Sequence, residues 1–281
     1  MNRAMPTVKV PRLAWSPAGL TRDPDVLAAE EPLEIRVHGR SVAVTMRTPG
    51  HDRELALGFL LTEGVVRSLD DVVDVQLCRE TEGGAAGNVA DVRVADPGRV
   101  DFARLTRHVF SSSSCGVCGK ATLAALAQAF PPAGPGPVFP AELIASLPAV
   151  LEAAQPGFGT TGGLHASGLF DASGALRCAR EDVGRHNALD KVIGRALLDD
   201  QLPLRDALLL VSGRVSFELV QKARAAGLPV IAGIGAPTSL AVEAAAAGGM
   251  ALAGFVRAGR LNVYCGHERL GLASPRAEER G

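Results

Sequence analysis

The sequence predicts an α/β protein with a smaller α+β domain followed by a larger α/β domain. The chain has 281 residues, which exceeds the usual size of one domain. Hydrophobic residues make up 47% and charged residues 21%, which is ordinary for a globular protein with a substantial core. Short apolar segments alternate with amphipathic segments through the second half of the chain, as they do when helices pack on a sheet.

An N-terminal extension is expected over residues 1–30, and the α+β domain over residues 31–110. Residues 34–46 alternate apolar and polar side chains, which is typical of a β-hairpin with one buried face. A helix is predicted for residues 53–65, where apolar side chains recur at helical spacing. Two further segments complete the predicted small sheet: residues 72–78 and 88–95.

Residues 111–140 are expected to form a mobile connection that carries the one close pair of cysteines. The stretch SSSSCGVCGK places Cys115 and Cys118 three positions apart. A short helix is predicted for residues 120–130. The stretch PPAGPGPVFP follows, and its prolines and glycines exclude regular structure.

The C-terminal α/β domain is predicted for residues 141–281, with a largely parallel or mixed sheet. The helix that begins near Gly184 has one apolar stripe, which is expected to leave Arg185, His186 and Asp190 on or near the exposed side. A further segment, VIAGIGAPTS, has the order strand, glycine turn, proline and helix start. This order exposes backbone N–H groups to which an anion could bind.

Charge and hydropathy exclude two classes of partner. Lys and Arg number 29 and Asp and Glu 30, a net charge of -1, so no global field would bind nucleic acid. The first residues contain no apolar signal segment, and no stretch reaches the roughly 18 apolar residues of a membrane span. We therefore expect a cytoplasmic protein whose cysteines are reduced.

The motif Cys115-x-x-Cys118 leaves several chemistries open. A structural zinc site usually takes four ligands as two close pairs, and only one close pair is present, although His108 or His165 could fold back. A thioredoxin-like motif follows a first strand, whereas this pair lies about midway along the chain. A reactive thiolate is favoured by the nearby Lys120 and a predicted helix start, and such a thiolate could accept and donate sulfur.

Three arginines follow predicted strand ends, where open α/β sheets usually bind ligands. They are Arg214, Arg257 and Arg260. Because guanidinium groups bind phosphate oxygens in pairs, they suggest a phosphate-containing ligand. His165 lies in the sequence His-Ala-Ser, without the glutamate that zinc deaminases need two positions later, so hydrolytic deamination is disfavoured.

Six segments together resemble the formate dehydrogenase accessory sulfurtransferase family. They are CGVCG, TGGLHASGLF, EDVGRHNALDKVIG, LLLVSGRVSFELVQKA, PVIAGIGAPTSLAVE and GFVRAGRLNVY. The resemblance covers residues 30–270. It implies that a cysteine desulfurase passes sulfur to Cys115 as a persulfide and that Cys118 assists. The sulfur then reaches the molybdenum of the bis(molybdopterin guanine dinucleotide) cofactor that formate dehydrogenase needs.

The resemblance also implies a cofactor site, a fold and an assembly. The segment that matches the family's cofactor-binding stretch consists of Phe255, Val256, Arg257, Ala258, Gly259 and Arg260. We expect His165, Asp182 and Arg185 to line the same pocket. The C-terminal domain is expected to be a three-layer α/β domain similar to the cytidine-deaminase fold, with no metal of its own, and the chain to form a homodimer.

Two other functions fit the same residues. One is a non-catalytic chaperone that holds the cofactor or the formate dehydrogenase while the cysteines are incidental. The other is a zinc-stabilised binding module. Loss of dehydrogenase activity on replacing the cysteines separates the first from a sulfurtransferase, and metal analysis separates the second.

Overall fold

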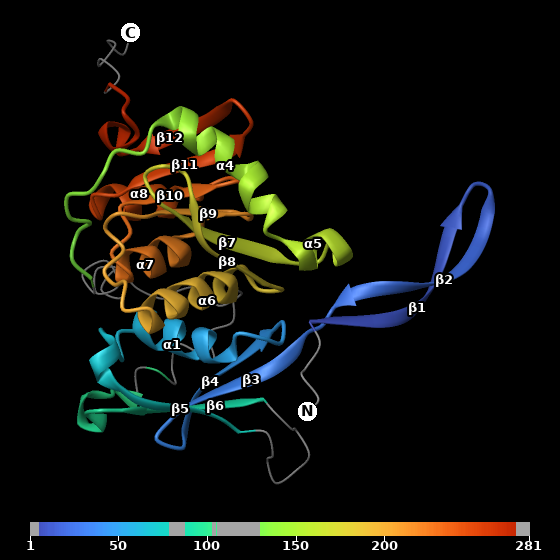
Figure 1. The fold of residues 1–281 in the computed structure, drawn as a ribbon, viewed down its shortest axis with the longest axis horizontal. Helices are drawn as coiled ribbons and strands as arrows, with labels where there is room; N and C mark the ends of the chain where they lie inside the picture. The colour runs from blue at the N-terminus through green and yellow to red at the C-terminus, as the bar shows by residue number, and fades with distance from the viewer. Residues whose placement is uncertain (1–5, 79–87, 103–104, 106–129, 274–281) are drawn as a thin grey trace.

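The computed structural model describes residues 6–78, 88–102, 105 and 130–273. These residues form a two-stranded, a four-stranded and a six-stranded sheet, with helices packed between and beside the two larger sheets (Figure 1). No helix in the described ranges is long and apolar enough to cross a membrane. The short 3-10 helices are η1 (Leu69–Asp71), η2 (Pro97–Arg99) and η3 (His267–Leu270).

The N-terminal part contains more regular structure than the sequence predicts. The expected extension forms a hairpin of strands β1 (Thr7–Ser16) and β2 (Gly19–Ala28), which projects from the body of the molecule (Figure 1). The hairpin, strands and helix predicted between residues 34 and 95 are confirmed. They are β3 (Glu31–Val37), β4 (Arg40–Arg47), α1 (Asp52–Thr62), β5 (Val72–Cys78) and β6 (Val89–Val94).

The six-stranded sheet has the order β12-β11-β10-β9-β7-β8. Its strands are β7 (His165–Phe170), β8 (Leu176–Asp182), β9 (Leu208–Val211), β10 (Val230–Gly233), β11 (Ala251–Arg257) and β12 (Arg260–Cys265). Strands β9, β10 and β11 are parallel, whereas β7 pairs antiparallel with both β8 and β9, and β12 antiparallel with β11. The prediction of a mixed sheet is therefore confirmed.

Helices cover both faces of this sheet and make a three-layer arrangement (Figure 1). In β9, Leu208 and Leu210 belong to a cluster with α4, while Leu209 and Val211 belong to the cluster on the other face, because side chains alternate along a strand. The helices are α4 (Ala141–Ala153), α5 (Pro156–Thr161), α6 (Arg185–Leu198), α7 (Phe217–Ala225) and α8 (Ser239–Ala247).

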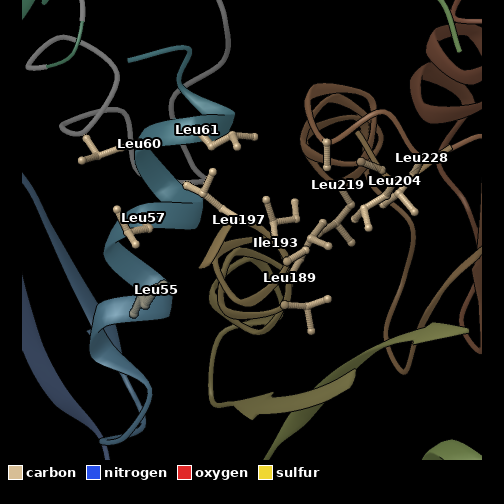
Figure 2. Close-up of a cluster of buried hydrophobic side chains, with 14 of the residues drawn as sticks. Leu55, Leu57, Leu60, Leu61, Leu189, Ile193, Leu197, Leu204, Leu219 and Leu228 are labelled. Carbon is tan, nitrogen blue, oxygen red and sulfur yellow. The ribbon is translucent and has the colours of Figure 1, made fainter. Parts of the chain in front are cut away.

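Helices α1 and α6 join the two sheets through one continuous core. Figure 2 shows Leu197 of α6 between the two helices and Leu57 on the side of α1 that faces away from α6, and one cluster of buried residues extends from the small sheet to α7 and α8. The two helices cross at glycines: a Cβ on Gly58 would lie 1.8 Å from the Asp190 carbonyl oxygen, and one on Gly194 1.8 Å from the Glu54 carbonyl oxygen.

This crossing explains why one expectation about α6 was wrong. Asp190 is only 2% exposed, because α1 covers the side of α6 that faces away from the large sheet. Its carboxylate accepts hydrogen bonds from Lys222 Nζ at 2.8 and 2.9 Å and from Thr62 Oγ1 at 3.1 Å. Burial raises the pKa of Asp190, and the charge of Lys222 opposes that rise.

The cysteine pair and most of the predicted helix 120–130 lie outside the described residues. The described end of the expected connection, residues 130–140, contains no helix or strand, as its prolines and glycines predict. It is bound to the C-terminal part, because Ala133 N donates to Gly248 O at 2.8 Å and Phe139 N donates to Arg269 O at 2.9 Å.

Candidate functional site at one edge of the six-stranded sheet

The ends of all six strands place the candidate residues at one edge of the large sheet. Because β8 to β11 run in the same direction, their C-terminal ends lie together, and the antiparallel β7 and β12 begin at that edge. His165 therefore begins β7 beside the end of β8, and Arg260 begins β12 beside the end of β11. We call this the strand-end edge: residues 182–186, 212–218, 234–238 and 255–260, with His165.

Three helices begin at the strand-end edge, because each of them follows one of these strands. Their N-cap residues are Gly184 for α6, Ser216 for α7 and Thr238 for α8. The first N–H groups of a helix have no partner within the helix, and the helix dipole places partial positive charge there. The edge is therefore electrostatically suited to an anionic ligand.

Glycines hold the loops of this edge against one another. Gly235 N donates to Gly213 O at 3.0 Å, and Phe255 N donates to Gly235 O at 3.1 Å. A Cβ on Gly235 would lie 2.8 Å from the Arg214 backbone nitrogen, so no larger residue fits without moving that loop. The loops after β9 and β10 and the end of β11 form one connected backbone platform.

The β11–β12 turn carries residues 255–260, the segment that the sequence resemblance predicts to bind the cofactor. Phe255 is 45% exposed and has a φ of 52°, and its neighbour Val256 is buried. Arg257 is exposed, but its Nη1 donates to Ile234 O at 2.6 Å, which ties the turn to the loop after β10. Ala258, Gly259 and Arg260 are exposed. A hollow of about 280 Å³ is lined by Phe255, Arg257, Arg260 and Asn262.

His165 and Arg185 flank the loop after β9. A Cβ on Gly213 would lie 3.3 Å from His165 Nδ1 and 3.7 Å from Arg185 Cδ. Burial, followed by the charges of Arg185 and His186, lowers the pKa of His165, so its imidazole is neutral at pH 7. The Nε atom of Arg185 is buried and has no hydrogen-bond partner among the described residues.

His186 and Glu218 are in contact at the same edge, with 2.8 Å between Nε2 and Oε2. The hydrogen bond from His186 lowers the pKa of Glu218 and outweighs the opposing effect of burial. Sequence reasoning missed Glu218 and also Asn262. Both could have been found: Glu218 lies in the first turn of a helix that follows a strand end, and Asn262 is two positions past Arg260 on the same strand face.

Asp182 has an interior position that differs from its expected place in the ligand pocket. It is 0% exposed, and its carboxylate accepts from Thr48 N at 3.1 Å and from Gly184 N at 2.8 Å. Lys191 Nζ lies 2.7 Å away, and Asn187 Nδ2 lies at 3.0 Å. With no exposed surface to contact a ligand, Asp182 instead fixes the loop that leads to Arg185.

Two of the described cysteines, Cys178 and Cys265, are poor nucleophiles by comparison with an activated thiolate. Cys78, Cys178 and Cys265 have free thiols and are partly buried. Burial raises the pKa of Cys178 and of Cys265, which disfavours their thiolates. No group of three or more His, Cys, Asp or Glu side chains within the described residues could hold a metal ion. Since Cys115 and Cys118 lie outside those residues, the zinc hypothesis stays untested.

Fold and site define the class: a mixed α/β protein that gathers arginines and helix N-termini at one sheet edge. A model of the FdhD/NarQ family matches residues 28–271. The sulfur carrier protein FdhD of Mycobacterium tuberculosis strain H37Rv is 51% identical over 254 residues, 88% of this chain and 92% of that protein. That of Streptomyces coelicolor is 50% identical over 254 residues, 89% and 90% of the two chains.

A solved structure supports the fold. A Desulfotalea psychrophila protein, described as a formate dehydrogenase accessory protein, matches with a TM-score of 0.75 and 24% identity. The match covers 94% of this chain and 99% of that chain. The chain belongs to the FdhD/NarQ family, which confirms the family resemblance inferred from the sequence.

Proposed function

We propose that this protein is a sulfur carrier that serves the maturation of formate dehydrogenase. The observation that carries the proposal is the identity of about 50%, over about nine tenths of the chain, with relatives named sulfur carrier protein FdhD. The CxxC motif supplies the thiol that such a function needs, and the strand-end edge supplies groups suited to a phosphate-containing substrate.

Cys115 is the proposed sulfur acceptor. Its thiolate attacks the outer sulfur of a persulfide on a cysteine desulfurase, which gives a persulfide on Cys115 and releases the desulfurase thiolate. Cys118 can then attack the inner sulfur, which closes a disulfide between Cys115 and Cys118 and releases hydrosulfide. The hydrosulfide would then replace an oxygen ligand of the substrate's molybdenum, and that oxygen would leave as water after protonation.

The proposed substrate is the bis(molybdopterin guanine dinucleotide) form of the molybdenum cofactor. Arg257 and Arg260 line the hollow at the β11–β12 turn and suit its pyrophosphate groups, since guanidinium groups bind phosphate oxygens in pairs. The exposed ring of Phe255 offers a face on which a guanine base could stack. Arg185 and the neutral His165 extend the site towards β7.

We also interpret the three-layer C-terminal part as related to the cytidine-deaminase fold, without its chemistry. The position two residues after His165, which holds the general acid in zinc deaminases, is occupied by Ser167. Ser167 is 1% exposed. A buried hydroxyl cannot replace a glutamate in proton transfer, so the fold serves binding. We further propose a cytoplasmic homodimer.

Sulfur mapping tests this function. The full chain is incubated with a cysteine desulfurase, cysteine and pyridoxal phosphate, and the added mass is located by peptide mass spectrometry without reductant. We expect one added sulfur on the Cys115 peptide and none in Cys115→Ala. The absence of added sulfur on both cysteines would overturn the proposal.

A chaperone that only holds the cofactor is separated by complementation. Under the sulfur-carrier proposal, Cys115→Ala abolishes formate dehydrogenase activity in cells that lack the wild-type gene. Full activity with Cys115→Ala and Cys118→Ala combined would support the chaperone. Stoichiometric zinc, with unfolding on chelation, would support the zinc-stabilised module.

A further inference from the structure

The loop between β8 and α6, residues 182–186, belongs to the strand-end edge but is bound by the small sheet. Its partners lie in residues 45–48, which we call the β4 end. Thr48 is 3% exposed, its N–H donates to Asp182 Oδ2 at 3.1 Å, and its Oγ1 accepts from Val183 N at 3.1 Å. These two partners are 134 and 135 positions away in the chain. The small sheet thus holds a loop that a distant part of the chain supplies.

The first turns of α6 are bound to the same segment. Asn187 Nδ2 donates to Met46 O at 2.7 Å, and its Oδ1 accepts from Thr45 Oγ1 at 3.1 Å. Lys191 is 1% exposed, and its Nζ donates to Thr48 O at 2.9 Å. The β4 end therefore forms hydrogen bonds both to the loop and to the helix that follows it.

Asp182 relays this position to the start of α6. Its Oδ1 accepts from Gly184 N at 2.8 Å and from Asn187 Nδ2 at 3.0 Å. Gly184 is the N-cap of α6 and has no side chain that could cap the helix, and Arg185 is the next residue. A change in the contacts of Thr48 must therefore shift the backbone that carries Arg185.

Apolar packing already joins the two sheets without these polar contacts. One buried cluster extends from the small sheet to α7 and α8, and α1 crosses α6 at Gly58 and Gly194. The buried pair of Asp182 and Lys191 is a different kind of contact. Such a pair often adds little net stability, because desolvation offsets the attraction between the charges. Hydrogen bonds do restrict distance and angle, so this network is suited to fixing a position.

The position of Arg185 matters because its surroundings are tight. A Cβ on Gly213 would lie 3.3 Å from His165 Nδ1 and 3.7 Å from Arg185 Cδ, so the loop after β9 lies against both side chains. The Nε atom of Arg185 is buried and lacks a hydrogen-bond partner among the described residues. A guanidinium binds two phosphate oxygens at once only when its plane is correctly placed.

We propose that Thr48 is a positioning residue for the cofactor site: it sets the place of Arg185 and thereby its binding of the cofactor's phosphate groups. This inference rests on the proposed function, because it gives the small sheet a role in binding the same substrate. The small sheet contributes no residue to the strand-end edge and acts through Asp182 and the start of α6. The Thr48 hydroxyl is the group to remove, because the backbone hydrogen bonds of Thr48 then stay in place.

Binding of guanosine diphosphate to the full chain, measured by isothermal titration calorimetry, tests the proposal. This probe carries the guanine base and a pyrophosphate, as the proposed substrate does. Thr48→Val leaves the N–H of Val183 facing a methyl group, and the loop must move to relieve it, so binding should weaken about tenfold. Thr48→Ser keeps the hydroxyl and should restore wild-type affinity. Thr45→Val, which removes the hydrogen bond to Asn187, should weaken binding by about threefold.

The matched control is Thr62→Val, a buried threonine at the other polar contact between the two parts. Thr62 is 8% exposed, and its hydroxyl donates to Asp190 Oδ1 at 3.1 Å and accepts from Lys222 Nζ at 2.9 Å. Neither partner belongs to the strand-end edge. Thr62→Val should therefore lower stability in urea denaturation as Thr48→Val does, but leave the affinity for guanosine diphosphate unchanged.

A second measurement separates positioning from a loss of stability. Burial, followed by the charges of Arg185 and His186, lowers the pKa of His165, and Asp182 opposes this with a smaller effect. If Thr48→Val moves the start of α6, the influence of Arg185 weakens and the pKa of His165 should rise in NMR titrations. The control variant should keep the wild-type titration, because a less stable chain that keeps its folded structure has the same charges around His165.

Wild-type affinity in both Thr48→Val and Thr45→Val, or an equal loss of affinity in Thr62→Val, would overturn the proposal. An unchanged His165 titration in Thr48→Val would do the same. If the wild type binds no guanosine diphosphate, the proposed cofactor site fails. The His165 titration needs no ligand, so it still decides whether Thr48 positions Arg185.

Discussion

Replacing Gly58 with alanine should open the helix crossing on which both sheets depend. The new Cβ would lie 1.8 Å from the Asp190 carbonyl oxygen and 2.9 Å from the Gly194 backbone nitrogen. Both obstacles are backbone atoms, so no side-chain rotation relieves them. The first contact must lengthen by at least about 1.2 Å, to 3.0 Å, before it reaches an acceptable distance, and α1 must move away from α6 by about that much.

The magnitude follows from the packing that this movement disturbs. A gap of 0.5–1 Å removes about a quarter to a half of the dispersion energy between facing atoms, and leucines line this crossing (Figure 2). Overpacking of a core typically costs about 1–3 kcal/mol, occasionally more. Alanine is better than glycine within a helix by about 0.5–1 kcal/mol. We therefore expect Gly58→Ala to lower the free energy of unfolding by about 2 kcal/mol.

Urea denaturation followed by circular dichroism measures the effect, with Gly159→Ala as control. Gly159 lies in α5, and a Cβ there would meet no atom within 4 Å, so alanine should be neutral or slightly stabilising. Gly194→Ala should resemble Gly58→Ala, and the double variant should lose less than the sum, because the first substitution already separates the helices. A wild-type midpoint for Gly58→Ala would refute this reasoning.

Two pH-dependent predictions follow from the lowered pKa values of Glu54 and His165. Burial alone would raise the pKa of Glu54, but hydrogen bonds from Arg180 and His51 lower it from 4.5 to about 2. Its stabilising effect is thus complete above about pH 4.5 and is lost as pH falls towards 2, so the stability difference between wild type and Glu54→Gln should shrink over that range in urea titrations. Burial and the charge of Arg185 lower the pKa of His165, so Arg185→Gln should raise that pKa in NMR titrations.

Each of the two pH-dependent predictions would be contradicted by one result. A stability difference that stays constant from pH 5 to pH 2 would show that Glu54 titrates alike in the folded and unfolded chain. An unchanged His165 titration in Arg185→Gln would show that the two side chains do not interact electrostatically at the strand-end edge.

The sequence by itself determined that strands and helices alternate in the C-terminal part. Hydrophobic periodicity is a local property, so the alternation of apolar and amphipathic segments corresponds to β9, α7, β10 and α8 in the structure. Open α/β sheets usually bind ligands at the ends of their strands, and this tendency likewise identified Arg257 and Arg260 as candidates. A strand end can be recognised from the residues next to it in the sequence. The family followed from six ordered motifs.

Local patterns could not predict the hairpin of residues 7–28. Its strands contain Pro11 and Pro24 and bury little apolar surface, so they lack the alternation that marks a half-buried strand. The two prolines made these strands hard to predict from the sequence. They also explain why the hairpin stays two-stranded, since neither proline has a backbone N–H to donate to a neighbouring strand.

Only the tertiary structure decided which polar residues face a ligand and which hold the two parts together. Asp182 lies at a strand end, as the arginines do, yet its carboxylate binds Thr48 N, a partner 134 positions away in the chain. Asp190 was expected near the exposed side of α6, but α1 covers it. Burial of a polar group depends on a second layer from a distant segment, and no local pattern records which segment that will be.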